Sequence, residues 1–275
     1  MGISKRRIMN LAIEHMKLPR SVYIVTAAVA ISLFASGCDD FCGFKSYEER
    51  GTWQDFHGIF TVVEPADLEL YRELLPAELE MPEQPAVGVF IVDYVIVVPC
   101  PMRPYLEGAL GIRCKYNGEV GWHTVTMPLN DVVAREGGRS IGFPKYLADV
   151  TLAQAGENWN GVVTHEGVVR MYLEFTPGLT RELEPFEEEL LAGGLPRLET
   201  PIFQVVPPGE GSDLRRITLS DKVPAIWEES TQGMVDIYIS PDDPWAGLID
   251  PGALPPAGLF QKFTGGKVMD SEKVN

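Results

Sequence analysis

The sequence has few of the residues that metal sites and nucleic-acid sites require. It contains 4 histidines and 4 cysteines among 275 residues, and neither a His-Glu-x-x-His nor a Cys-x-x-Cys motif occurs. Lys and Arg number 23 against 39 Asp and Glu, which gives a formal net charge of −16. Because nucleic-acid binding depends on clustered Lys and Arg, this balance argues against a nucleic-acid partner. We therefore expect the protein to bind neither a metal ion nor a nucleic acid.

Long apolar runs are also scarce. Beyond residue 37, no run approaches the ~20 apolar residues of a membrane-spanning helix. Apolar residues nevertheless make up 45% of the chain and charged residues 23%, which is ordinary for a packed globular protein and argues against disorder. A chain of 275 residues can form one large domain or two small ones.

The first 37 residues differ from the rest. Val22–Phe34 is an uncharged apolar run preceded by Lys17 and Arg20; it is short for a stable membrane span but fits the h-region of a signal peptide. The Ala-Ser-Gly-Cys sequence that ends at Cys38 resembles the lipobox of bacterial lipoproteins, whose cysteine is lipidated and becomes the mature N-terminus. We therefore expect residues 1–37 to be a signal peptide of the lipoprotein type, and the protein to be exported and lipid-anchored to a bacterial membrane, on its periplasmic or outer face.

Residues 38–52 are polar and charged, and we expect them to form a tether. Removal of residues 1–37 takes away five basic residues and one acid, so the remaining body is still more acidic. An anionic lipid surface would repel such a body, and the lipid anchor alone would hold it at the membrane. Of the cysteines other than Cys38, Cys100 and Cys114 could form one disulfide, and a buried thiol is an equal alternative.

The sequence from Trp53 onward has the pattern of a mainly β domain, which we expect to cover residues 53–268 before a tail over 269–275. Gly88–Val98 is almost continuously apolar and β-branched, as in a strand buried on both faces. Asn117-Gly118 between two strand-like runs predicts a hairpin with a type I′ turn. Further strands are expected at 108–116, 119–127, 150–155, 159–164, 168–175, 202–206, 214–219 and 233–240, and a loop over 241–256.

Two short helices are expected beside these strands. Asp67–Leu75 has helical spacing and ends before Pro76. Asn130–Glu136 begins at a capping asparagine and ends before Gly137-Gly138.

Gly142-Phe143-Pro144-Lys145 resembles the active-site segment of the acetoacetate decarboxylase family. Tyr105-Leu106-Glu107, which precedes the Asn117-Gly118 hairpin, is similar to the glutamate-bearing strand pair of that family, and Met127–Asp131 is similar to the segment before its short helix. The resemblance covers roughly residues 53–265. It implies an α+β, mainly β fold: a closed antiparallel β cone or barrel with short peripheral helices.

The residues themselves direct attention to the same place. With Asn117-Gly118 at the centre of the turn, the hairpin register places Glu107 opposite Pro128. The chain then makes one short helix and reaches Lys145, so Glu107 and Lys145 are expected to meet over a cavity floored by Met127 and Phe143.

A lysine in such a place can act as a nucleophile. A lysine of pKa ~10.4 is about 0.04% free amine at pH 7, whereas one of pKa ~7 is half deprotonated. Burial favours the neutral form, and the acetoacetate decarboxylase family is itself a known case of a lysine activated by its surroundings. The resemblance implies that Lys145 forms a Schiff base, that Glu107 transfers protons, and that neither a metal nor an organic cofactor is needed.

The sequence also departs from the family pattern. Tyr146 stands where the family commonly has a second lysine, Gly138-Arg139 replaces its Arg-Glu pair, and one of its pocket acids falls near Phe90. Arg139 or Arg103 could replace the arginine that would meet a substrate carboxylate. The residues expected to line the substrate pocket are Met127, Phe143, Tyr146, Phe90 and Arg139.

These features predict an exported carboxy-lyase that resembles acetoacetate decarboxylase, forms a lysine Schiff base with a small β-keto acid or ketone, and releases CO₂. Aldolase or dehydratase chemistry with the same lysine is one alternative. A noncatalytic small-molecule-binding lipoprotein on the same fold is another. The sequence does not determine the oligomeric state, and a homo-oligomer is one of the states that it allows.

Overall fold

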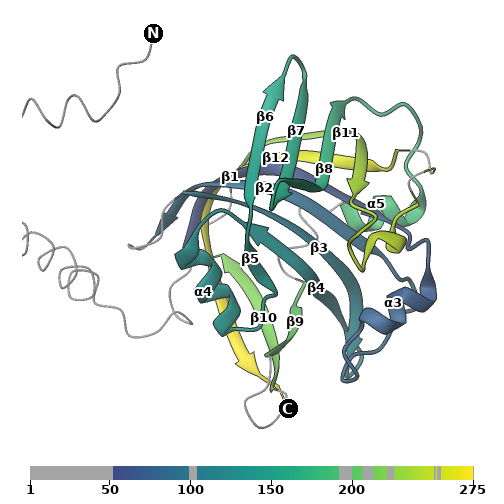
Figure 1. Ribbon diagram of the computed structural model, residues 1–275, viewed down its shortest axis with the longest axis vertical. Helices are drawn as coiled ribbons and strands as arrows, with labels where there is room; N and C mark the ends of the chain where they lie inside the picture. The colour runs from purple at the N-terminus through teal and green to yellow at the C-terminus, as the bar shows by residue number, and fades with distance from the viewer. Residues whose placement is uncertain are drawn as a thin grey trace, which may run out of the picture. The chain divides into compact units, whose positions relative to one another are not determined.

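β-branched and aromatic runs make the chain mainly β, as the sequence predicts (Figure 1). The computed structural model describes residues 52–98, 104–191, 200–206, 213–221, 226–250, 252 and 255–274. The expected signal peptide, most of the tether, Cys38, Cys100 and Arg103 therefore lie outside the described residues. The strands are β1 (Thr52–Val63), β2 (Val87–Val98), β3 (Tyr105–Tyr116), β4 (Glu119–Leu129), β5 (Lys145–Leu147), β6 (Asp149–Ala155), β7 (Asn158–His165), β8 (Val168–Pro177), β9 (Ile202–Val206), β10 (Asp213–Asp221), β11 (Ile226–Ile239) and β12 (Ala257–Lys273).

The strands form one mainly antiparallel sheet in the order β1-β2-β3-β4-β9-β10-β12-β11-β8-β7-β6, with β5 added beside β4. The long strand β12 also pairs with β1, so it joins strands β1 to β4 to strands β11, β8, β7 and β6. The sequence predicted a closed cone or barrel, but the sheet of this structure is not closed. Strand β6 is left at a free edge, and among the described residues β4 and β9 share the single bridge Trp122–Ile202.

The hairpin of β3 and β4 turns at Asn117-Gly118, and both turn residues have positive φ, as a type I′ turn requires. The expected register holds from the turn as far as Gly111, but a β-bulge between Leu110 and Gly111 then shifts it by one residue. Glu107 consequently lies opposite Leu129, and the expected pairing with Pro128 is wrong.

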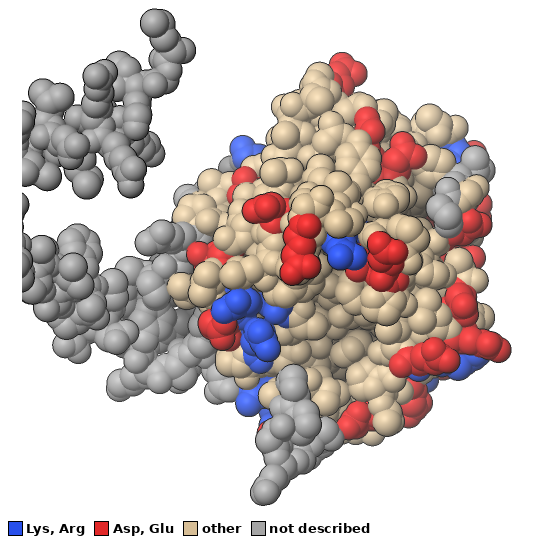
Figure 2. Space-filling view, viewed as in Figure 1, with Lys and Arg blue, Asp and Glu red and all other residues tan. Residues whose placement is uncertain are grey.

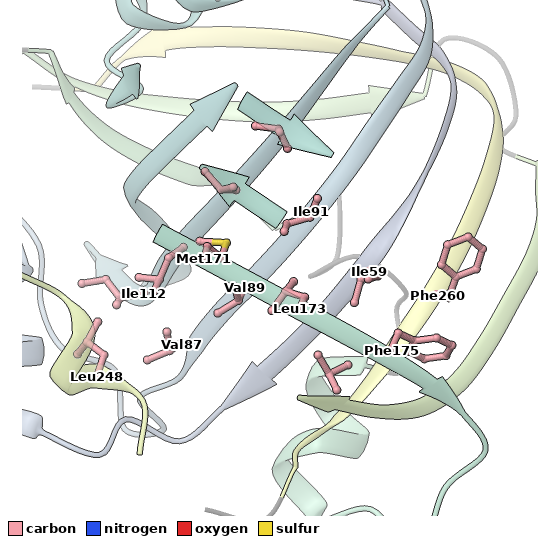
Figure 3. Packing of buried hydrophobic residues seen from close by; sticks show 14 of the residues in the cluster. Ile59, Val87, Val89, Ile91, Ile112, Met171, Leu173, Phe175, Leu248 and Phe260 are labelled. Carbon is pink, nitrogen blue, oxygen red and sulfur yellow. The ribbon is translucent and has the colours of Figure 1, made fainter. Parts of the chain in front are cut away.

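The sheet separates two sets of buried side chains. On one face, β1, β2 and β3 pack against β7, β8 and β11 through a large apolar cluster that includes Val89, Ile91, Met171 and Leu173 (Figure 3). Gly161 permits this close approach, because an added Cβ would lie 2.8 Å from Cδ1 of Ile91. The opposite face of β1 to β4 carries separate apolar clusters, and the candidate site described below lies on that face.

Three α-helices accompany the sheet in the described residues: α3 (Leu68–Leu74), α4 (Val132–Ser140) and α5 (Pro185–Leu191). Asp67 caps α3 by accepting hydrogen bonds from two backbone N–H groups, and the helix ends at Leu74 with Leu75 as its C-cap, one residue earlier than expected. Helix α4 begins one residue later than expected, because Asp131 caps it. It also continues through the two glycines to Ser140, so the expected stop at Glu136 is wrong.

The C-terminal segment is a strand and not a tail. Strand β12 continues to Lys273, where it pairs with Arg215 of β10. Residues 269–273 are therefore part of the sheet. In the portion of the chain that the structure describes, no helix has both the length and the apolar character to cross a bilayer.

Candidate active site

Lys145 and Glu107 meet in the structure although 38 residues separate them in the chain. The Lys145 ammonium nitrogen Nζ donates a hydrogen bond to Oε2 of Glu107, and the two side chains form an ion pair. Lys145 is 8% exposed and Glu107 is 3% exposed. A buried pair of opposite charges is costly to desolvate, and functional sites are one of the places where such pairs occur.

Strand order explains how the two side chains come together. Glu107 is on β3, which pairs with β4, and Lys145 opens β5, which pairs in parallel with β4 on its other side. Lys145 stands directly beside Met127 of β4 in this register. The two charged residues therefore flank one strand, and both side chains lie on the same face of the sheet.

Aromatic rings surround the pair. The Lys145 Nζ lies 5.7 Å from the ring centroid of Tyr105 and 5.8 Å from that of Phe143. The Tyr94 hydroxyl donates a hydrogen bond of 3.5 Å to Oε1 of Glu107, and the rings of Tyr94 and Tyr105 are 4.8 Å apart. These contacts reduce the access of water and strengthen electrostatic interactions within the site.

An apolar cluster continues from the pair into the core. It contains Met127 and Phe143 together with Ala109, Ile141 and Ile217, and Phe90 packs partly buried against it. Phe90 also contacts Phe60, at a centroid distance of 5.8 Å. The structure thus brings together three of the residues expected to line the pocket, namely Phe90, Met127 and Phe143.

Tyr146 does not face the pair. Successive side chains of a strand point to opposite faces, and Tyr146 follows Lys145 in β5. Its ring lies edge-on to His165, with the centroids 5.0 Å apart, and burial raises the pKa of its hydroxyl. Strand alternation therefore turns Tyr146 toward β7, away from the Lys145–Glu107 pair.

Arg139 is not part of the buried group either. Its side chain is exposed at the end of α4, a helix that also carries Arg135. Figure 2 shows a group of basic side chains over the region of α4, on a face that otherwise carries mostly acidic charge. The other suggested arginine, Arg103, lies outside the described residues.

The sequence reasoning did not identify Tyr94, Tyr105, Gly138 or Gln204. Strand alternation could have indicated Tyr105, which lies two residues before Glu107 and therefore on the same face. Gln204 had a weaker signal, as an isolated polar residue within the apolar strand β9. No sequence signal indicated Gly138, which lies against the Lys145 side chain because of the way α4 packs.

His123 and Cys114 lie on other parts of the sheet, His123 beside Phe203 and Cys114 in a separate apolar cluster. His123 Nδ1 lies 2.9 Å from the carbonyl oxygen of Phe203, and burial lowers the pKa of the His123 imidazole. Cys114 is a free buried thiol, and burial raises its pKa to about 12. In the described ranges, no group of three or more His, Cys, Asp or Glu side chains is arranged to hold a metal ion.

A buried amine beside a carboxylate, with aromatic walls, is suited to covalent chemistry on a carbonyl group. The family model for acetoacetate decarboxylase matches residues 47–252, which is more than half of the chain. The chain belongs to the acetoacetate decarboxylase family. Members of this family are enzymes, so the buried pair lies in a fold that is used for catalysis.

Solved structures of acetoacetate decarboxylase-like proteins share this fold. The acetoacetate decarboxylase of Legionella pneumophila has a TM-score of 0.65 at 19% identity, with coverage of 82% of this chain and 87% of that enzyme's chain. An acetoacetate decarboxylase-like enzyme from Sphingomonas wittichii RW1 has a TM-score of 0.63 at 16% identity, with coverage of 84% and 95%. The enduracididine biosynthesis enzyme MppR, solved with pyruvate, has a TM-score of 0.61 at 13% identity, with coverage of 82% and 91%. No curated protein matches the sequence. At these identities the structures establish the fold alone.

Proposed function

We propose that this member of the acetoacetate decarboxylase family is a carboxy-lyase that forms a Schiff base between Lys145 and a small β-keto acid or ketone. The observation that carries the proposal is the contact between Lys145 and Glu107 inside an apolar, aromatic environment. An unpaired lysine would be expected at the surface, where its charge is hydrated, so the buried position of Lys145 depends on its pairing with Glu107.

Glu107 is placed to make the amine nucleophilic. The reaction needs one proton to pass from the Lys145 ammonium to the Glu107 carboxylate, which leaves a neutral amine and a neutral acid. The lone pair of Nζ attacks the carbonyl carbon of the substrate. The protonated Glu107 then returns its proton to the departing hydroxyl, which leaves as water, and the product is a protonated imine.

The protonated imine accepts the electron pair of the bond that breaks. In a β-keto acid this is the bond between the α-carbon and the carboxylate, which leaves as CO₂ while an enamine forms. A proton is then added to the enamine carbon, and water hydrolyses the resulting imine to release the ketone and the Lys145 amine. Glu107, in contact with Nζ, is the group placed to transfer these protons.

Borohydride trapping tests the proposal directly. The full protein is incubated with acetoacetate and sodium borohydride, and the expected result is a stable mass adduct located on Lys145. Lys115 is the matched control, because it is a lysine of β3 that is paired with Glu83 and lies away from the site. The adduct should persist in Lys115→Ala and disappear in Lys145→Ala. An unmodified wild-type protein, or an unchanged adduct in Lys145→Ala, would contradict the proposal and favour a binding protein.

The same imine could support aldol or dehydration chemistry, since the enamine can attack an aldehyde in place of a proton. Product analysis distinguishes the reactions: a decarboxylase releases one CO₂ per acetoacetate consumed, whereas an aldolase forms a condensation product only when an aldehyde is supplied.

We also propose that the protein is exported and lipid-anchored through Cys38, on the sequence features described above. Growth of expressing bacteria with an alkyne-labelled fatty acid should label the wild-type protein and leave Cys38→Ser unlabelled. An unlabelled wild-type protein would remove the support for the anchor.

A further inference from the structure

Gly138 of α4 faces the side chain of Lys145. A Cβ added at Gly138 would lie 2.4 Å from both Cδ and Cε of Lys145, and 3.2 Å from its Nζ. Carbon atoms in favourable contact are about 3.5–4.0 Å apart. No side chain therefore fits at position 138 while Lys145 keeps its present path to Glu107.

A glycine at this position carries a cost. Glycine inside a helix is less stable than alanine, and Gly138 lies within α4 with Gly137 beside it. Its φ is not positive, so the backbone conformation does not call for glycine. The glycine is instead explained by Lys145, whose side chain occupies the space where a side chain of residue 138 would lie.

We propose that Gly138 is a positioning residue, whose missing side chain leaves the space through which the stem of Lys145 reaches Glu107. The atoms that would collide belong to a flexible lysine side chain. Substitution by alanine should therefore displace the amine and leave the fold intact. The catalytic consequence rests on the proposed function, whereas the steric coupling between the two residues does not.

A double-mutant cycle tests the steric coupling without any substrate. Gly138→Ala should lower the midpoint of thermal unfolding in the wild-type background, because it displaces a buried charge. In the Lys145→Ala background the colliding atoms are gone, so Gly138→Ala should raise the midpoint through its better helix propensity. Val133→Ala, at an exposed position of the same helix, should give the same shift in both backgrounds. An equal loss for Gly138→Ala in both backgrounds would overturn the proposal.

Borohydride trapping measures whether Gly138→Ala also slows Schiff-base formation at Lys145. If wild type is trapped by acetoacetate and borohydride, Gly138→Ala should be trapped about 100-fold more slowly, as misplacement of a reacting group by ~1 Å can cost that much. Val133→Ala should be trapped at the wild-type rate. Wild-type trapping in Gly138→Ala would also overturn the proposal. If wild type is not trapped but the cycle shows coupling, the proposed function fails and the steric role stands.

A second inference rests on Gln204 of β9, which is 1% exposed. Its amide nitrogen Nε2 is buried and has no hydrogen-bond partner among the described residues. Strand alternation puts Gln204 on the face of Ile202, which packs against the cluster containing Met127 and Phe143. Its Cβ would lie 3.0 Å from a Cβ added at Gly142, so it borders the segment that leads to Lys145.

A buried amide donor without a partner destabilises the fold, and a ligand that accepts a hydrogen bond would recover this loss. Arg215 of β10 lies opposite Gln204 in the sheet, so both side chains are on one face. The Arg215 guanidinium donates a hydrogen bond of 3.4 Å to Oγ of Ser271 and adds positive charge beside the amide. We infer that Gln204 donates to the carboxylate of the substrate, with Arg215 providing attraction. This inference deepens the proposed function, because it selects a keto acid over a neutral ketone.

Comparison of two probes tests the inference. Gln204→Leu removes the donor and should slow trapping by subsaturating acetoacetate about tenfold, the value of a hydrogen bond to a charged group. Trapping by acetone, which lacks the carboxylate, should slow far less. The unfolding midpoint should not fall, because the variant also removes an unpaired buried donor. Equal slowing with both probes, or a lower midpoint, would show that a bound water or a packing role accounts for Gln204.

Binding to Lys145→Ala separates this inference from the proposed function. Acetoacetate cannot form an imine with that variant, yet it should raise the midpoint of unfolding through contacts with Gln204 and Arg215. The rise should be lost in the double variant Lys145→Ala, Gln204→Leu. The absence of any rise in Lys145→Ala would contradict the inference, whatever the trapping result in wild type.

Discussion

Met127 of β4 lies beside Lys145 of β5 at the first pair of their parallel register. This neighbour relationship joins the candidate nucleophile to the hairpin that carries Glu107, since β4 is the partner of both β3 and β5. Met127 is 6% exposed and belongs to the apolar cluster at the site. The Met127 side chain therefore contributes both to the packing of the core and to the apolar surroundings of the Lys145 amine.

Truncation of Met127 should lower the stability of the fold. Met127→Ala leaves a cavity and should lower the free energy of unfolding by about 2–5 kcal/mol. Met127→Leu nearly conserves the volume and should cost less than about 1.5 kcal/mol. Urea denaturation measures both variants. If alanine and leucine cost the same, Met127 does not fill the space that the structure shows.

Removal of Glu107 should leave Lys145 as an unpaired buried cation. Glu107→Ala is expected to lower the free energy of unfolding by about 3–5 kcal/mol, since breaking one partner of a buried pair leaves the other uncompensated. The double variant Glu107→Ala, Lys145→Ala should recover part of this loss. Chemical denaturation of wild type, the two single variants and the double variant gives the coupling. Strict additivity would mean that the two charges do not interact.

The pairing of Lys145 with Glu107 was predictable from sequence because each residue lies in a recognisable local pattern. The Asn117-Gly118 turn determines the hairpin, and Gly142-Phe143-Pro144-Lys145 marks the nucleophile. The exact register was not predictable, because the bulge near Leu110 is a local break in pairing that leaves no residue signature. The strand identity of Tyr146 was missed for a similar reason. Strand β5 is three residues long, and an element this short has no periodicity from which its faces can be assigned.

The end of helix α4 could not be predicted from the sequence, for a different reason. Two consecutive glycines usually mark the end of a helix, and the sequence accordingly predicted a stop at Glu136. In the structure, the helix continues through them to Ser140. The role of Gly138 depends on where a lysine seven residues later points, which is information about tertiary packing that no local pattern contains.

Glu187 should make stability depend on pH at the acidic end. The carboxylate accepts two hydrogen bonds of 2.6 Å from Arg181 and further bonds from the backbone N–H groups of Glu184 and Ala257. Burial alone would raise the pKa of Glu187, but these hydrogen bonds outweigh it, so the pKa lies below its ordinary value of 4.5. The stabilisation is therefore fully present above about pH 4.5 and is lost as the pH falls through the lowered folded value.

Glu187→Gln tests this dependence. The variant keeps the shape of the side chain but removes the charge, and it should be less stable than wild type at about pH 7 by about 1–3 kcal/mol. The difference should shrink below about pH 4.5, where wild type begins to lose the same interaction. Glu188→Gln, an exposed neighbour on α5, should differ little from wild type at either pH. Urea denaturation across the pH range measures the differences, and a gap that stays constant with pH would contradict the assignment.

Two tyrosines on opposite faces of the sheet should respond differently to loss of the hydroxyl group. Tyr94→Phe removes the hydrogen bond to Oε1 of Glu107 and should slow borohydride trapping by about tenfold, the lower end of the value of one hydrogen bond to a charged group. Tyr146→Phe removes a hydroxyl on the face that carries His165, so it should be trapped at the wild-type rate. Trapping rates with acetoacetate at several pH values compare the two variants, and Tyr94→Phe should also alter the pH profile because it changes the contacts of the group that transfers protons. If Tyr146→Phe is slowed as much as Tyr94→Phe, the alternation of β5 does not separate the two faces as the structure places them.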